Sequence, residues 1–376
     1  MSLPTTRILL RSPYFVSKET STLRTIRVDL YVYTGTLTTD KPSNPNYTLT
    51  ATAYTNSNGN KYAEIDIAPY CRDWIDPSFD FSQNDPSNAV WIEWDLYYTT
   101  STSTGLILDS SSTAVGLDGF SYFEEGYNKA LPQSVLLSGN YIVLPTGQDT
   151  TIPVLQDNLV NFKLYAEKTL SGGETPLATV SFPGTSNEST DVIYYADTTT
   201  GAGTPHTVVF DFSGGIVDQT VYLRYNDECR NTPIEVAFIN RYGAIQRAWM
   251  FGNSKQTLSV SENKYKRNLL TGTGSYDALS HQNSILNKNG TMSVVCNTGF
   301  YREESNYIWQ EMMLSEKVWL YTAEDTIFTT VYSASNITMP VNVVDTQIQY
   351  KNHLDDKLIN YTFTFEYAGD RINSVR

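Results

Sequence analysis

A strict alternation of apolar and polar side chains constrains this fold more than any other feature of the sequence. In residues 26–33, IRVDLYVY, one face carries only aliphatic residues: Ile26, Val28, Leu30 and Val32. The opposite face carries Arg27, Asp29, Tyr31 and Tyr33. Because successive side chains of a β-strand point to opposite sides of the sheet, this period of two predicts a half-buried strand. Residues 89–100, AVWIEWDLYYTT, repeat the pattern.

Turn-forming clusters separate many segments of this kind. KPSNPN at 41–46 and NSNGN at 56–60 are two of them, and strands are expected beside them at 47–53 and 62–68. A second series of expected strands covers 134–145, 161–170, 178–184, 191–199, 206–214 and 220–227. Short strands at this spacing, with turns between them, predict β-sandwiches.

The chain has 376 residues, which is more than one hydrophobic core normally serves. We therefore expect a mainly β protein, with tandem β-sandwich domains followed by a β-rich α+β C-terminal domain that contains one clear helix. The expected domains are an N-terminal β-sandwich at 1–128, an acidic β-sandwich at 129–224 and a C-terminal assembly domain at 225–376.

The C-terminal domain contains an unusual stretch, FINRYGAIQRAWMFG at 238–252. Two apolar arms around a short polar turn predict a β-hairpin, with a positive φ at Gly243. We expect Arg241 and Arg247 to pair with carboxylates of a neighbouring subunit. The expected helix is Glu304–Ser315, with Ser305 as its N-cap and an apolar stripe facing the core.

Ten residues are candidates for the core and the assembly contacts of this domain, because large aromatic faces need an apolar partner. The candidates are Arg241, Tyr242, Gly243, Arg247, Trp249, Phe251, Trp309, Trp319, Phe363 and Phe365. The last expected strand, 357–368, places its large apolar residues on one face: Ile359, Tyr361, Phe363, Phe365 and Tyr367. A second sheet or another subunit is expected to cover that face.

Charge is unevenly distributed along the chain. The net charge is −14, of which residues 101–223 carry −10, from three Lys against 13 Asp and Glu. A grip on nucleic acid needs a basic stripe, so this balance argues against one. The short basic cluster Lys264, Lys266 and Arg267 is interpreted as a solvated or subunit-contacting loop, with a nucleic-acid site as the alternative.

Three cysteines, Cys71, Cys229 and Cys296, are too few and too far apart for a disulfide framework, and we expect buried free thiols in a reducing compartment. No apolar run of about 18 residues occurs, so no membrane span is expected. The N-terminal residues contain no long apolar segment of the kind found in secretion signals, so no secretion signal is expected.

Catalytic patterns are not found. His206, His281 and His353 lie at no metal-ligand spacing, and no phosphate-binding, nucleophile-elbow or zinc-protease motif occurs. Glu93 and Asp95 share a strand face and are the best candidates for a glycosidase pair, although acids on a wet strand face need no such role. We expect no catalytic residues, no cofactor, no metal and no enzymatic activity.

Several stretches together resemble virion proteins of crAss-like, short-tailed bacteriophages. They are LLRSPYFV, VDLYVYTGT, EIDIAPYCRDWID, PIEVAFINRYGAIQRAWMFG, YKRNLLTGTGSYD, NTGFYREESNYIWQEMMLSEKVWL and DDKLINYTFTFEYAGDRINSVR. Residues 129–224 take no part in the resemblance. The resemblance implies a structural ring protein of the tail barrel, below the portal, without enzymatic residues.

The same resemblance implies a homo-oligomeric ring of twelve or six copies, with neighbouring tail, portal or muzzle proteins. Viral DNA would pass through the lumen without specific binding, and no membrane is involved. The protein would assemble in the bacterial host cytoplasm and reside in the virion tail. We expect the C-terminal domain to make the ring contacts, and the acidic middle domain to line the channel or face solvent.

Two other functions stay open at this point. The chain has 27 Tyr and 6 Trp, and exposed aromatic rings on a sheet are used both by protein interfaces and by sugar-binding surfaces. A phage adhesin or carbohydrate-binding receptor-recognition protein is therefore the alternative. A glycan-active enzyme that uses Glu93 and Asp95 is the third possibility.

Overall fold

The computed structural model describes residues 6–35, 37, 39–77, 79, 89–103, 105–129, 131, 134–156, 159–166, 174–182, 193–201, 203–227, 230–270, 272–322, 337–350, 358–370 and 372. The chain is mainly β, with several sheets and one clear helix, as the sequence predicted. It forms two compact units. The first unit comprises residues 1–227 and two later segments, Ala237–Ala248 and Tyr307–Ser315. The second comprises Glu228–Val236, Trp249–Asn306 and Glu316–Arg376.

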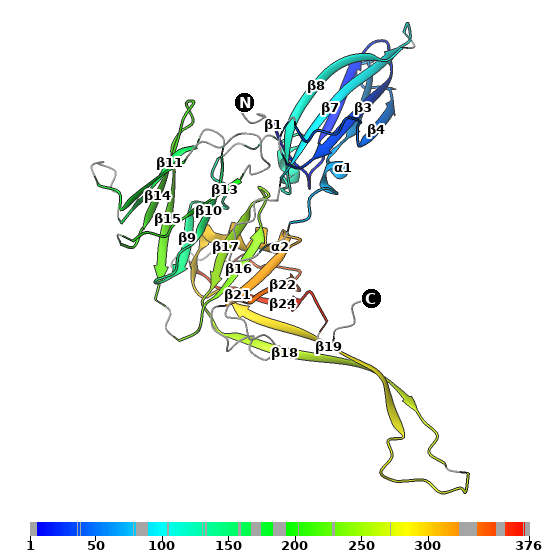
Figure 1. Ribbon diagram of the computed structural model, residues 1–376, viewed down its shortest axis with the longest axis vertical. Coiled ribbons are helices and arrows are strands. Elements are labelled where there is room, and N and C mark those ends of the chain that lie inside the picture. The colour runs from blue at the N-terminus through cyan, green and yellow to red at the C-terminus, as the bar shows by residue number, and fades with distance from the viewer. Residues whose placement is uncertain are drawn as a thin grey trace. The chain divides into compact units, whose positions relative to one another are not determined.

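A β-sandwich opens the first unit, and its strands appear in blue and cyan in Figure 1. One sheet has the order β1 (Thr6–Leu9), β8 (Ile107–Leu117), β7 (Ala89–Thr100), β3 (Leu23–Tyr33) and β4 (Tyr47–Thr52). The other has the order β2 (Phe15–Thr20), β6 (Lys61–Asp66) and β5 (Tyr54–Thr55), and the short helix α1 (Ala68–Arg72) follows β6.

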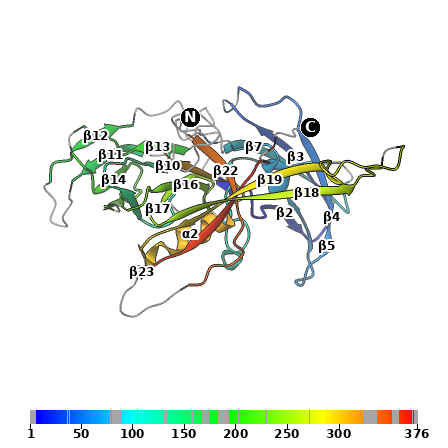
Figure 2. The ribbon, with the colours of Figure 1, turned by 90° about the horizontal axis from the view of Figure 1, so that it is seen from below.

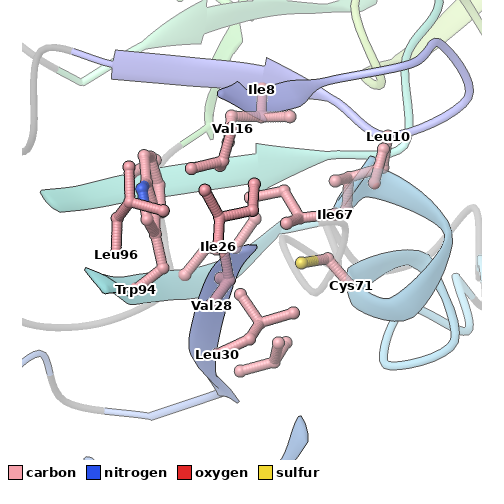
Figure 3. Close-up of a cluster of buried hydrophobic side chains, with 14 of the residues drawn as sticks. Ile8, Leu10, Val16, Ile26, Val28, Leu30, Ile67, Cys71, Trp94 and Leu96 are labelled. Atoms are coloured by element: carbon pink, nitrogen blue, oxygen red, sulfur yellow. The ribbon is translucent and has the colours of Figure 1, made fainter. Parts of the chain in front are cut away.

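The core of this sandwich confirms the alternation predicted in β3. Ile26, Val28, Leu30 and Val32 are all fully buried, and Figure 3 shows the first three in one cluster with Val16, Ile67 and Cys71. The polar face differs from the prediction at two positions, because Asp29 and Tyr33 are buried as well. Asp29 accepts hydrogen bonds from Arg27 Nε at 2.8 Å and from Thr48 Oγ1 at 3.0 Å. Each buried polar group therefore has a partner on its own sheet.

The middle segment forms a second pair of sheets. The larger sheet has the order β12 (Ala178–Ser181), β11 (Leu159–Tyr165), β14 (Thr207–Phe212), β15 (Gln219–Asn226) and β9 (Tyr141–Pro145). The smaller pairs β10 (Thr151–Leu155) with β13 (Ile193–Asp197). Aromatic contacts join the two sheets: the ring of Tyr194 lies 6.3 Å from that of Phe162 and 5.1 Å from that of Phe182.

The second unit is built on a sheet with the order β21 (Val318–Thr322), β22 (Ile337–Val343), β24 (Thr362–Tyr367), β19 (Asn283–Asn297) and β18 (Ser254–Lys266). A small ladder pairs β20 (Tyr301–Arg302) with β23 (Leu358–Ile359). The strand predicted at 357–368 is thus two strands, β23 and β24. Its inward alternation is confirmed, because Ile359, Tyr361, Phe363 and Phe365 are buried.

The predicted helix is shorter than expected. A 3₁₀ turn, η2 (Glu303–Ser305), precedes α2 (Asn306–Leu314), so Ser305 is the last residue of the turn and the N-cap prediction was wrong. The apolar stripe is confirmed in Ile308, Trp309 and Met312, which are buried. A second 3₁₀ turn, η1, covers Phe123–Glu125.

The predicted hairpin is confirmed. β16 (Ile234–Ile239) and β17 (Ile245–Met250) are neighbouring strands, and Gly243 between them has a φ of +77°. All six residues of β16 are buried, which exceeds the one-sided burial that a hairpin on a surface would show.

Candidate assembly site

Five of the predicted assembly residues belong to the interior of the second unit. Their exposed fractions range from 0 to 7%, and they are Trp249, Phe251, Trp319, Phe363 and Phe365. The hydroxyl of Tyr301 donates to the carbonyl oxygen of Trp249 at 2.5 Å, which fixes one ring against the backbone of another. These aromatic residues stabilise the fold of the unit and offer no surface to a partner. Trp309, in the first unit, is fully buried too.

The turn of the hairpin, residues 240–244, is held by the side chain of one buried residue, Asn240. Its Oδ1 accepts hydrogen bonds from the backbone N–H groups of Tyr242 at 3.0 Å and Ala244 at 3.2 Å. Its backbone carbonyl accepts from Gly243 N–H at 3.0 Å. Asparagine favours such turns because its short amide reaches the backbone two residues on.

The same asparagine joins the turn to the middle sandwich. Asn240 Nδ2 donates to the carbonyl oxygen of Leu136 at 2.7 Å and to Gln246 Oε1 at 3.1 Å. Gln246 Oε1 also accepts from the N–H of Ser138 at 3.0 Å. Both amide side chains are buried, and a buried polar group is costly unless it is paired, so the network fixes where the hairpin can lie.

Helix α2 contributes a buried carboxylate to this turn. Glu311 is 2% exposed, accepts a hydrogen bond from the N–H of Arg241 at 3.0 Å, and accepts another from the hydroxyl of Ser138. Burial raises the pKa of Glu311 above its ordinary value, while the hydrogen bonds from Ser138 and Arg241 oppose that shift.

Arg241 pairs inside its own chain, in contrast to the intersubunit pairing that the sequence suggested. Its Nη2 donates to Glu125 Oε2 at 2.5 Å, and its guanidinium lies 4.6 Å from the centre of the Tyr122 ring. The hydrogen bond from Arg241 lowers the pKa of Glu125. Arg247 places its guanidinium 5.5 Å from the ring centre of Phe79. Pairing of Arg247 with a carboxylate of a neighbouring subunit stays a prediction.

The exposed feature of the second unit is a long two-stranded ribbon, which we name the arm: residues Leu258–Lys266 of β18 and Asn283–Met292 of β19. β19 pairs with β24 only from Ser293 to Asn297, so the arm extends past the rest of the sheet. In both views β18 and β19 remain side by side along this ribbon (Figure 1, Figure 2). A one-residue bulge interrupts the register between Asn263 and Lys264.

Apolar side chains along the arm and its loop are largely exposed. Exposed fractions are 52% for Leu258, 49% for Val260, 48% for Ile285 and 89% for Leu279. Leu258 lies opposite Met292 in the register, on the same face as the buried Val294. The apolar face of the core therefore continues into solvent along the arm. Contiguous exposed apolar surface of this kind marks interaction sites.

The arm is also basic. Residues 254–297 carry five Lys or Arg against two Asp or Glu, a net of +3 in a chain of net −14. Lys264 and Lys288 approach Glu262 at 2.5 and 3.5 Å, and the hydrogen bond from Lys264 lowers the pKa of Glu262. The predicted basic cluster, Lys264, Lys266 and Arg267, is exposed at the outer end of β18 and just beyond it.

The residues considered for catalysis have structural partners. Glu93 accepts hydrogen bonds from the Tyr33 hydroxyl at 2.5 Å and from Lys41 Nζ at 2.6 Å. Asp95 accepts from Ser111 Oγ at 2.5 Å. Among the described residues, no group of three or more His, Cys, Asp or Glu side chains is placed to hold a metal ion.

The expectations for the cysteines, His353 and a membrane span can be compared with the structure only where it describes the residues. Cys71 and Cys296 are buried and free of disulfide bonds, and burial raises the pKa of the Cys296 thiol to about 12. Cys229 and His353 lie outside the described residues. Within the part of the chain that the structure describes, no helix has the length and apolar character needed to cross a membrane.

One exposed aromatic cluster lies on the first sandwich. The rings of Tyr47 and Tyr70 are 5.3 Å apart, and the indole N–H of Trp74 donates to the Tyr47 hydroxyl at 3.3 Å. Tyr70 is 38% exposed and Trp74 is 42% exposed. The cluster presents flat apolar surface with polar edges, which suits an interface or a sugar ring.

Sequence reasoning missed the arm and the buried polar network. The alternation TLSVS at 257–261 was a signal for a strand, but its neighbours are polar on both faces, so no buried face marked it. Asn240 was visible as a turn residue, whereas the partners Leu136, Ser138 and Glu311 are remote in sequence, and no local pattern identifies them.

Comparison with known proteins gives no family assignment: no protein-family model matches the chain, and a search of curated proteins finds no match. The fold and site define a mainly β chain that buries the candidate assembly residues Trp249, Phe251 and Trp319 in its interior and exposes a basic, partly apolar arm.

Proposed function

We propose that this protein is a structural subunit of a bacteriophage virion, a ring or adaptor protein of the tail barrel that assembles around the DNA exit channel below the portal. The sequence resemblance to crAss-like phage virion proteins motivates the proposal. The arm carries it, because an isolated subunit leaves long strand edges and apolar side chains in water.

Open strand edges favour association. Among the described residues, β18 has β19 as its only neighbour, and the arm part of β19 has only β18. Unpaired N–H and C=O groups on such edges are ready to pair with another chain. A partner that covers Leu258 and Val260 would bury apolar surface that a monomer leaves hydrated, which is the main driving force of association.

Ring closure follows from the kind of interface. An arm that binds a different surface of the next copy makes a head-to-tail contact, and repeated head-to-tail contacts close into a ring when the rotation between copies is suitable. The proposal includes a ring of twelve or six copies, flanked by portal, muzzle or other tail proteins. The net negative charge of the chain would keep DNA from adhering to the lumen of the ring, because it repels the negatively charged phosphates.

Solution mass and electron microscopy of the purified chain test this function. Closed rings of twelve 42.3 kDa chains, roughly 500 kDa, or of six chains at half that mass, are expected. A matched control replaces residues 258–292 by Asn-Gly, a turn that closes short hairpins, and leaves the sheet paired to β24 in place. The control is expected to remain monomeric. A wild-type chain that stays monomeric at high concentration would contradict the proposal.

Carbohydrate recognition is the second candidate, favoured by the Tyr47, Tyr70 and Trp74 cluster. A phage adhesin of this kind would stack a sugar ring on the exposed indole. A glycan array with wild-type protein and the Trp74→Ala variant tests it. Binding that disappears in the variant would favour the adhesin, whereas the ring proposal expects no glycan binding and unchanged assembly of Trp74→Ala.

A further inference from the structure

We propose that the arm of one copy binds the acidic middle sheet of a second copy, at the free edge of β12. This inference rests on the proposed ring function and names the surface that receives the arm. Charge, strand edges and exposed apolar residues of the two surfaces support it independently.

The arm and the middle sandwich carry opposite net charges. The arm region 254–297 has a net charge of +3, and residues 129–223 have a net charge of −6, from 3 basic and 9 acidic residues. The first sandwich, residues 1–128, has a net charge of −7, so the choice of the middle sheet rests on the open edge of β12 and its exposed apolar residues. Complementary potentials speed the encounter of two copies and fix the register in which they meet.

The edge strand β12 offers backbone groups for pairing. It is bonded on one side to β11, with Phe162 opposite Val180 and Asn161 opposite Ser181. Within the described residues it has no neighbour on its other side. Three of its four residues are exposed. Addition of a strand from another chain to such an edge supplies main-chain hydrogen bonds, and side chains of alternate residues supply selectivity.

Apolar residues are exposed at both surfaces. Val180 on β12, opposite Phe162 in the register, is 36% exposed, and Val160 on β11, at the bulge between Leu159 and Asn161, is 45% exposed. On the arm, Val260 and Leu258 are about half exposed. Contact between the two pairs would remove apolar surface from water on both partners, which stabilises the contact at high salt as well.

The arm is long enough for this role. Its nine residues of β18, Leu258–Lys266, lie beyond the part of the ribbon where β19 pairs with β24, and they span about 30 Å at roughly 3.3 Å per residue. That length is similar to the diameter of a small domain. The contact also revises the expectation that the acidic segment only lines the channel or faces solvent, because the β12 edge is assigned to the neighbouring copy.

Paired charge reversals test the contact. The arm variant carries Lys264→Glu, Lys266→Glu and Arg267→Glu, and the sheet variant carries Glu174→Lys, Asp211→Lys and Asp218→Lys. The control variant reverses three bases elsewhere: Arg24→Glu, Lys61→Glu and Arg302→Glu. Urea unfolding establishes that each variant folds before its mass is measured.

The expected results differ for each preparation. Each of the two variants alone should be monomeric, with association weakened by at least about 100-fold, because like charges then meet at the interface. An equal mixture of the two should form mixed rings, because the acidic arm of the arm variant meets the basic sheet of the sheet variant, and the basic arm of the sheet variant meets the acidic sheet of the arm variant. One chain that carries all six changes should form rings again, and the control variant should assemble as the wild type does.

Rings from the arm variant, or monomers from the six-change chain, would overturn this inference and leave the ring proposal intact. If the wild type forms open chains of subunits that require the arm, ring closure is wrong and the contact at β12 stands. If the wild type is monomeric, both proposals are wrong. A short labelled DNA duplex tests nucleic acid as the occupant. Lost DNA binding by the arm variant, with unchanged rings, would assign the arm to DNA and overturn the contact.

A crosslink locates the contact. With Cys229→Ser as background, Val260→Cys on the arm and Val180→Cys on β12 should form an intermolecular disulfide on oxidation, in the rings and not in the arm variant. Thr55→Cys paired with Val260→Cys is the matched control. Equal crosslinking yields for the two pairs would contradict docking at β12.

Discussion

A β-carbon on Gly119 would lie 2.5 Å from the carbonyl oxygen of Arg241, the same oxygen that accepts a hydrogen bond from Phe120 N–H at 2.8 Å. The end of the first sandwich and the hairpin turn are therefore in backbone contact. A β-carbon on Gly243 would lie 2.8 Å from the backbone nitrogen of Asp118, and Gly243 has a φ of +77°.

Alanine at either glycine should destabilise the first unit. We expect Gly119→Ala and Gly243→Ala each to lower the free energy of unfolding by about 1–3 kcal/mol, because backbone atoms must move apart and, at Gly243, a strained φ is imposed. Gly105→Ala, where a β-carbon meets nothing within 4 Å, is the control. Urea unfolding measures all three, and equal effects in the three variants would refute the close packing.

Removal of the Trp249 side chain should destabilise the second unit by ~3–5 kcal/mol, because a large buried side chain leaves a cavity. Trp249 is 4% exposed. Leu279→Ala, at a position that is 89% exposed, is the control and should have little effect on unfolding. Thermal unfolding followed by circular dichroism measures both. A Trp249→Ala variant as stable as the wild type would contradict the core assignment.

Glu311 should weaken the fold as pH rises. Its pKa is raised in the folded state, so between the unfolded value of about 4.3 and the raised folded value only the unfolded chain releases the proton. Stability is therefore lost as pH increases through that interval. Glu311→Gln keeps an acceptor for Arg241 N–H and removes this loss. Urea unfolding at several pH values should show that the free energy of unfolding declines less with rising pH in the variant than in the wild type. Parallel curves for the two proteins would contradict this role of Glu311.

Ionised Glu125 should stabilise the fold, and this contribution should be lost as pH falls. Its pKa is lowered by the hydrogen bond from Arg241, so its contribution is present above the unfolded pKa of about 4.3 and is lost as pH falls through the lowered folded pKa. Glu125→Gln should lose less stability on acidification than the wild type. Acid unfolding followed by tryptophan fluorescence measures the difference, with Glu124→Gln as the neighbouring control.

Local patterns predicted much of the fold for a physical reason. Where one face of a strand packs on the core and the other carries polar groups, as in β3, apolar and polar residues alternate in the sequence, and the same holds for β24. β10 escaped prediction because Pro153 interrupts its apolar run and proline is rare inside sheets. Pro153 is tolerated here, and its carbonyl accepts a hydrogen bond from Leu136 N–H at 2.9 Å.

The candidate site was harder to predict because its contacts are remote in sequence. Arg241 meets Glu125 across 116 residues, and Ser138 meets Glu311 across 173. Such pairings leave no periodic trace. The aromatic residues singled out as assembly candidates are large, and large residues occur both in cores and in interfaces, so composition alone does not separate the two roles.

The discontinuous first unit has a consequence for the order in which the protein matures. Its last segment, Tyr307–Ser315, carries Glu311 and follows the arm in the chain. A ribosome therefore completes both arm strands before it delivers the residues that finish the first unit. Folding of that unit is thereby delayed until about four-fifths of the chain has been synthesised. A nascent subunit cannot present a finished partner surface while its own arm is still emerging.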